Sequence, residues 1–135
     1  MVFLDAFALI ALVLDETSAD AVDELIATRD CAVTSVNLAE TVDVCCRARG
    51  LNLSDIDAVL SLLLDGPVRV LAPGAEEGRA AGLIRAAHYD GRARPISLAD
   101  CFLLAAATPI DAIATEDAAV LAIARELGIE TIALP

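Results

Sequence analysis

The sequence predicts an α/β fold in which helices cover both faces of a parallel sheet. Short apolar runs alternate along the chain with longer segments whose apolar residues recur at helical spacing. The short runs are continuous rather than alternating with polar residues, as is typical of parallel strands buried on both faces. A length of 135 residues fits one domain, and no internal repeat or low-complexity stretch divides it. We therefore expect a single domain over residues 1–135.

Local signals place the elements along the chain. Ser18 is expected to cap one helix, and Ser54 with Asp57 three residues later matches a capping box. Gly50 and Gly128 follow the ends of two other helices. In order, we expect strand 2–4, helix 6–14, helix 18–28, strand 31–34, helix 37–49, helix 54–65, strand 68–71, helix 74–89, loop 90–95, helix 97–107, strand 112–114, helix 117–127 and strand 129–134.

Four acidic residues fall where such a sheet places its ligand site. Asp5 follows the first strand, and Asp117 follows the fourth. Glu40 and Asp100 each lie one turn into a helix. Ligands of open α/β sheets bind beyond the carboxyl ends of the strands, near a switch in strand order. We therefore expect the four carboxylates to meet at one edge of the sheet.

Helix capping is the alternative explanation for three of these acids. Glu40 and Asp100 match capping boxes that begin three residues earlier, and Asp117 suits a helix N-terminus on dipole grounds. Asp5 is different, because it lies between apolar segments where a carboxylate is costly to bury without a partner. The chain has no Lys, and no Arg lies near Asp5 in sequence.

Carboxylates gathered at one place repel one another unless a cation intervenes. Two of them about 4 Å apart repel by roughly 4 kcal/mol at an effective dielectric constant near 20. Oxygen ligands favour Mg²⁺ or Mn²⁺ over zinc. We predict such an ion bound by Asp5, Asp100 and Asp117. Glu40 would orient water or act as a base. The Thr115 hydroxyl would lie near the metal or a phosphate, although helix capping explains this residue equally well.

The charge balance limits which partners are possible. The net charge is −12 and all nine basic residues are Arg, which opposes loose, nonspecific binding of nucleic acid. One stretch departs from this balance, because residues 79–94 contain four arginines and a single acid, Asp90. A solvated helix face is the bland explanation. The alternative is a set of contacts for RNA phosphates, made by Arg79, Arg85, Arg92 and Arg94.

The cysteines and the apolar start of the chain bear on its compartment. The four cysteines match neither a zinc site nor a CxxC motif, so we expect buried free thiols in a reducing compartment. Residues 1–14 lack the basic start and cleavage site of a signal peptide and are too short to span a bilayer. We expect a cytoplasmic protein.

Four segments resemble the motifs of PIN domains, and their order and spacing most resemble the VapC-type toxins of bacterial toxin–antitoxin pairs. The segments are residues 4–12 (LDAFALIAL), 37–40 (NLAE), 96–105 (ISLADCFLLA) and 114–117 (ATED). The resemblance spans essentially the whole chain. Each motif alone is one acid in an apolar frame, whereas the set of four is fairly specific.

The resemblance implies a Rossmann-like three-layer α/β/α sandwich with about five parallel strands, acting as a homodimeric, Mg²⁺-dependent endoribonuclease. Asp5, Glu40, Asp100 and Asp117 match the family's acidic quartet, and Thr115 matches its hydroxyl. A VapB-like antitoxin with a basic or aromatic tail would fill the groove. One departure is Phe7, where family members often have a small polar residue.

The expected reaction is in-line attack of a metal-activated water on an RNA phosphodiester. The alternative is a catalytically inactive PIN-like module that dimerises and docks a partner. A phosphatase of the haloacid dehalogenase kind is disfavoured, because Phe7 stands where it requires a second Asp. A response-regulator receiver is disfavoured as well, because both classes require a Lys and this chain has none.

Overall fold

A single five-stranded sheet organises residues 1–135, all of which are described in this computed structural model. Its strands lie in the order β3-β2-β1-β4-β5, and every neighbouring pair is parallel. The strands are β1 (Val2–Leu4), β2 (Cys31–Thr34), β3 (Val68–Leu71), β4 (Ala112–Thr115) and β5 (Glu130–Ala133). The predicted α/β class and parallel sheet are therefore confirmed.

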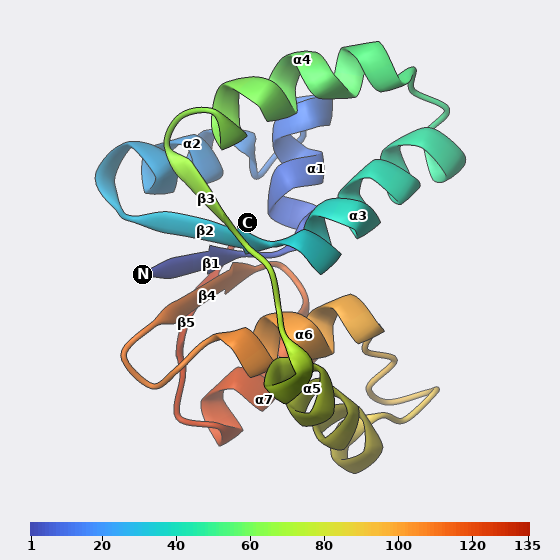
Figure 1. The fold of residues 1–135 in the computed structure, drawn as a ribbon, viewed down its shortest axis with the longest axis vertical. Helices are drawn as coiled ribbons and strands as arrows, with labels where there is room; N and C mark the ends of the chain where they lie inside the picture. Colours follow the sequence, from blue (N-terminus) through green and yellow to red (C-terminus); the bar gives the residue numbers. More distant parts are fainter.

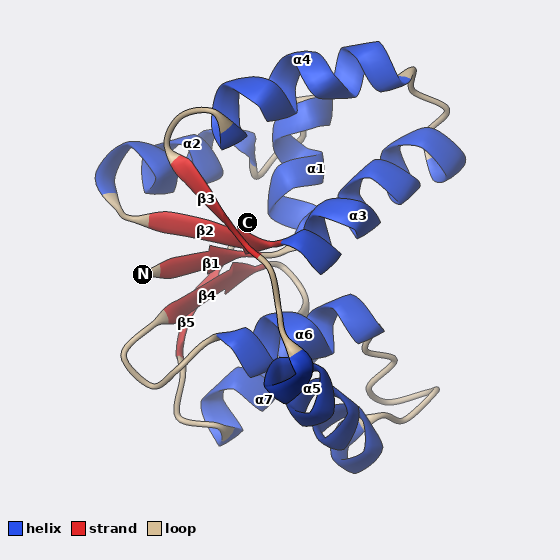
Figure 2. Ribbon diagram, viewed as in Figure 1, coloured by secondary structure: helices blue, strands red, loops and turns tan.

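The helices form two layers, one on each face of the sheet (Figure 1). One layer contains α1 (Ala6–Leu14), α2 (Ala19–Thr28), α3 (Ser35–Asp43) with the π-helical η1 (Val44–Ala48), and α4 (Leu53–Leu64). The other contains α5 (Ala75–His88), α6 (Leu98–Ala106) and α7 (Ala118–Glu126). Figure 2 shows the sheet between these two sets of helices, as a three-layer sandwich requires. No helix is both long and apolar enough to cross a membrane.

Each face of the sheet has its own apolar core, and the strands contribute to both. Along β1, Val2 and Leu4 pack in the core beneath α1, α2 and α4, whereas Phe3 packs in the core beneath α6 and α7. This alternation follows from the two-residue period of a strand. All three side chains are apolar because both faces are covered.

The strand order changes direction between β1 and β4. The chain first adds β2 and β3 on one side of β1 and then places β4 and β5 on the other. Leu4 lies beside Ala114 in the register, so Asp5 and Thr115 are neighbours just beyond it. This is the switch point at which open α/β sheets bind their ligands.

Two helix starts and one helix cap differ from the sequence predictions. Ser18 makes no capping hydrogen bond, and its hydroxyl instead donates to the carbonyl of Pro135 at 2.6 Å. The helix expected to start at Ser54 begins at Leu53, after Asn52, without any side-chain cap. The helix expected from Asn37 begins at Ser35, and Thr34 caps it by accepting from the Asn37 N–H at 3.1 Å.

Candidate active site

Asp5 lies at the carboxyl end of β1, with only 1% of its surface exposed. It is also the N-cap of α1, where its Oδ1 accepts from the Ala8 N–H at 2.8 Å. Its Oδ2 accepts a hydrogen bond from the Thr115 hydroxyl. Burial raises the pKa of Asp5 to about 7, although both hydrogen bonds oppose the rise. The negative charges of Asp100 and Glu116 raise it further.

Asp100 faces the same edge from the first turn of α6. It forms a capping box with Ser97: its carboxylate accepts from the Ser97 N–H at 2.7 Å, and its own N–H donates to the Ser97 hydroxyl at 3.0 Å. Burial raises the pKa of Asp100, the Ser97 hydrogen bonds lower it, and the charge of Asp117 raises it. The predicted capping role and the position beside other acids are therefore both present.

Glu40 approaches Asp100 from the opposite layer, because α3 packs on α6. Burial raises the pKa of Glu40, and the nearby charge of Asp100 raises it further, while the Ser97 hydroxyl lowers it. The capping box suggested for Glu40 was wrong, since Thr34 starts the helix and places Glu40 in its second turn. Glu40 therefore interacts electrostatically with Asp100 and does not cap a helix.

Asp117 completes the group from the start of α7. Its Oδ1 accepts from the N–H groups of Ala119 and Val120 at 2.6 and 3.3 Å. The Asp117 N–H donates to the Thr115 hydroxyl at 2.9 Å, and that hydroxyl also donates to Asp5. Thr115 therefore joins the two acids that follow β1 and β4.

The four acids act on one another electrostatically, and Asp100 is the common member. Its charge raises the pKa of both Asp5 and Glu40, and Asp117 raises its own. No set of three or more His, Cys, Asp and Glu side chains is close enough to hold a metal ion as these side chains stand. The donors are nevertheless of the type that Mg²⁺ accepts, and Mg²⁺ keeps several waters and needs only one or two carboxylates. On this chemistry the residues fit a magnesium site.

Asn37 is a polar residue whose surroundings the sequence did not reveal. It is fully buried in the first turn of α3, its Oδ1 accepts from the Thr34 hydroxyl, and its Nδ2 has no hydrogen-bond partner. Nδ2 is the one buried side-chain polar atom without a partner, and leaving such a donor unpaired costs about 1–3 kcal/mol. The surrounding sequence, which also contains Thr34, Ser35, Glu40 and Thr41, offers no local signal that distinguishes this asparagine.

The four arginines between residues 79 and 94 do not form one uniform patch. Arg94 pairs with Glu126 at 2.9 Å, and its guanidinium lies 3.4 Å from His88. Arg85 lies over the ring of Tyr89, 4.4 Å from the centroid. Arg79 and Arg92 make no salt bridge. Three of the four arginines therefore have no carboxylate partner.

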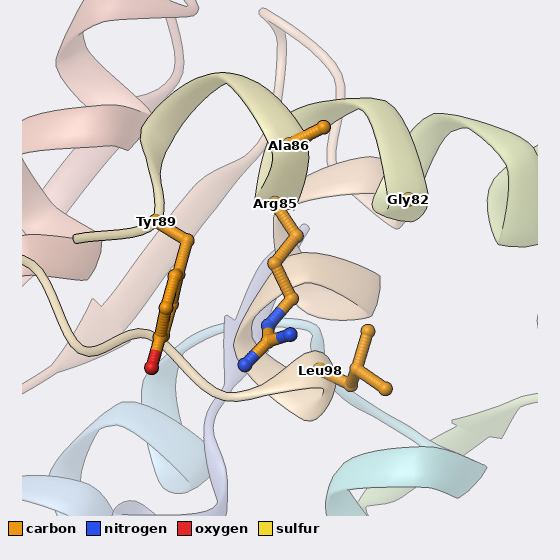
Figure 3. Close-up of a pocket in the computed structure, with 5 residues that line it drawn as sticks. All are labelled: Gly82, Arg85, Ala86, Tyr89 and Leu98. Atoms are coloured by element: carbon orange, nitrogen blue, oxygen red, sulfur yellow. The ribbon is translucent and has the colours of Figure 1, made fainter. Parts of the chain in front are cut away.

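A surface pocket of about 400 Å³ lies between α5 and the start of α6, and none of the four acids lines it. Its lining consists of Gly82, Arg85, Ala86, Tyr89 and Leu98 (Figure 3). Leu98 directly follows Ser97, the capping partner of Asp100. The pocket and Asp100 therefore share the first turn of α6.

Comparison with protein families gives one match over almost the whole chain. The model of the PIN domain family matches residues 2–134. No curated protein matches the chain.

Three solved structures have the same fold. VapC20 of Mycobacterium tuberculosis, a toxin that cleaves the sarcin–ricin loop, is 19% identical with a TM-score of 0.64, over 100% of this chain and 90% of that one. VapBC2 of Rickettsia felis, bound to a DNA fragment from its promoter, is 13% identical with a TM-score of 0.66, over 100% of both chains. FitAcB of Neisseria gonorrhoeae is 19% identical with a TM-score of 0.63, over 98% of this chain and 96% of that one. At such identities the likeness establishes the fold.

Proposed function

Because the chain belongs to the PIN domain family, we propose that it is a metal-dependent endoribonuclease and the toxin of a VapBC-type pair. The observation that best supports this is the mutual electrostatic influence of Asp5, Asp100 and Asp117 at the switch point of the sheet. A bound Mg²⁺ or Mn²⁺ would neutralise these carboxylates, make a water molecule more acidic and stabilise charge on the phosphate.

The chain's own residues would divide the remaining work. Asp100 and Asp117 would bind the ion, because hydrogen bonds to backbone N–H groups fix one oxygen of each and leave the other without a protein partner. Asp5 would contribute negative charge from its buried position, where the Thr115 hydroxyl holds its carboxylate by a hydrogen bond. Glu40, whose pKa is raised by burial and by Asp100, would accept a proton from the attacking water.

The proposed partners follow from the charge of the site and from the relatives. VapC20 is a toxin that cleaves the sarcin–ricin loop, and VapBC2 has the same fold. We extend this to a VapB-like antitoxin whose basic tail would cover the acidic edge. A homodimer and a cytoplasmic location remain predictions from the sequence and from the resemblance.

The test measures cleavage of single-stranded RNA in Mg²⁺ and in EDTA. Wild type should cleave only with the metal, and Asp5→Asn and Asp100→Asn should lose at least about 100-fold in rate. Asp57→Asn is the matched control, because Asp57 is an exposed acid on α4 and its removal changes the net charge equally. Equal cleavage by all four proteins would remove these acids from the reaction.

A second function, a PIN-like module that only docks a partner, is favoured by one observation. No three potential ligands stand close enough to hold a metal, and three of the acids already serve as helix caps. A module of this kind would gain no thermal stability from millimolar Mg²⁺, whereas a genuine metal site would.

A further inference from the structure

The pocket beside α6 combines features that suit a flat, aromatic ligand. Arg85 is held over the Tyr89 ring, and its one hydrogen bond, to the Ile96 carbonyl, is long at 3.5 Å. Figure 3 shows the Arg85 side chain reaching between Tyr89 and Leu98. Tyr89 and Leu98 are exposed by 50% and 54%. Their apolar surfaces therefore flank a guanidinium whose terminal N–H groups are free.

The position and size of the pocket point to the substrate of the acidic site. The volume of about 400 Å³ lies within the range of about 300–1,000 Å³ that is usual for small-ligand pockets. Leu98 follows Ser97 in the first turn of α6. Side chains two residues apart on a helix face different sides, so a ligand against Leu98 lies one helix face away from the Asp100 carboxylate. A nucleotide whose phosphate is at the acids could place an adjoining base here.

Resting on the proposed ribonuclease function, we propose that this pocket binds one unpaired nucleobase of the RNA, stacked on the Arg85–Tyr89 pair. RNA readers commonly stack splayed bases on aromatic rings and on guanidinium planes. Arg85 would then serve base recognition rather than the phosphate contact predicted from the sequence. A phosphate would lose hydration against Leu98 and Ala86, whereas the ring of a base would bury apolar surface.

Charge favours RNA over a basic protein segment as the occupant. Arg85 is the only charged residue in the lining, and it opposes a basic antitoxin tail. An aromatic tail, the other kind that the resemblance implies, is distinguished by the experiment below. The same positive charge attracts the polyanionic RNA, which the net charge of −12 otherwise repels. The pocket is therefore a cationic site for a base next to an acidic site for a metal ion.

Gly82 offers a way to block the pocket without removing any charge. A Cβ built at Gly82 meets no atom within 4 Å, so Gly82→Leu should fill the pocket without strain in α5. Ala87→Leu is the matched control, because Ala87 is exposed on the same helix but does not line the pocket. Tyr89→Ala removes the stacking surface, and Tyr89→Phe keeps it.

The experiment measures kcat and KM for an RNA oligonucleotide and for a series in which one nucleotide at a time is abasic. For wild type, Tyr89→Phe and Ala87→Leu, one abasic position should raise KM about tenfold with kcat little changed. Tyr89→Ala and Gly82→Leu should raise KM about tenfold for the intact RNA and show no further loss at that position.

Each contrary outcome has a distinct meaning. If no abasic position affects wild type, or if both pocket variants behave like wild type, the base site is overturned while the cleavage chemistry stands. If Gly82→Leu affects only inhibition by an antitoxin, the pocket belongs to the protein partner and the inference is again overturned. If wild type cleaves no RNA in Mg²⁺, the proposed ribonuclease function is overturned. The base site, which rests on that function, is then overturned with it, and the wild-type measurement alone shows this.

Discussion

The acidic edge and the arginines of residues 79–94 differ in what holds their charges in place. Asp5, Asp100 and Asp117 each accept a backbone N–H within three residues at the start of a helix. Arg94 instead depends on Glu126, 32 residues away. Local chain geometry therefore fixes the acids, whereas distant partners decide which arginines remain available for a ligand.

The largest effect should come from Asp5→Asn, which breaks the acidic edge at its most buried member. Cleavage should fall by at least about 100-fold, yet the metal-free protein should become more stable at pH 8. The Asp5 pKa of about 7 in the fold, against 3.8 without it, means that its stabilising contribution is complete below pH 3.8 and is lost by about pH 7. The neutral Asn avoids this loss.

The gain should not exceed about 4 kcal/mol in the free energy of unfolding, which is the upper limit set by the two pKa values. Urea unfolding in EDTA at pH 8 and at pH 4 measures it, and the gain should shrink at pH 4, where wild-type Asp5 is protonated. A variant less stable than wild type at pH 8 would show that Asp5 is not costly to bury.

Metal binding should have the next largest effect, and it should depend on pH. At a hundred times its dissociation constant, Mg²⁺ would stabilise the protein by about 2.7 kcal/mol. The stabilisation should be larger at pH 8 than at pH 5.5, because Asp5, whose pKa is about 7, is protonated at pH 5.5 and no longer contributes its negative charge to the site. Thermal unfolding with MgCl₂, against NaCl of equal ionic strength, measures the difference. An equal shift at both pH values would contradict it.

Two serines for which the sequence predicts the same capping role should differ in how much their removal lowers the free energy of unfolding, an effect smaller than that of metal binding. Ser97 accepts the Asp100 N–H at 3.0 Å, so Ser97→Ala should cost about 1 kcal/mol. Ser54→Ala should cost almost nothing, because its helix begins one residue earlier and has no side-chain cap. Urea unfolding of both variants compares them directly. A comparable loss at Ser54 would mean that it does cap α4.

These serines illustrate how far the sequence can be interpreted. Strand ends and most helix starts were predictable, because apolar runs and capping residues are local signals; the positions of Asp5, Asp100 and Asp117 followed from them. The predicted capping role of Ser54 was wrong because Leu53, with its strong helix propensity, begins the helix one residue before the serine. The unpaired Asn37 amide and the pocket at Arg85 depend on contacts between distant segments, which no local pattern encodes.

The smallest effect should come from changing the remote partner of an arginine. Glu126→Gln would release Arg94, now paired at 2.9 Å, while costing less than about 1 kcal/mol because both side chains are exposed. If Arg94 then contacts phosphate, the salt dependence of binding to single-stranded RNA should steepen by about 0.7 in log–log slope. Glu130→Gln is the control, because Glu130 is an exposed acid that makes no ion pair. Fluorescence anisotropy with labelled RNA at several salt concentrations measures both variants. An equal steepening by both would trace the effect to net charge alone and would remove Arg94 from the RNA surface.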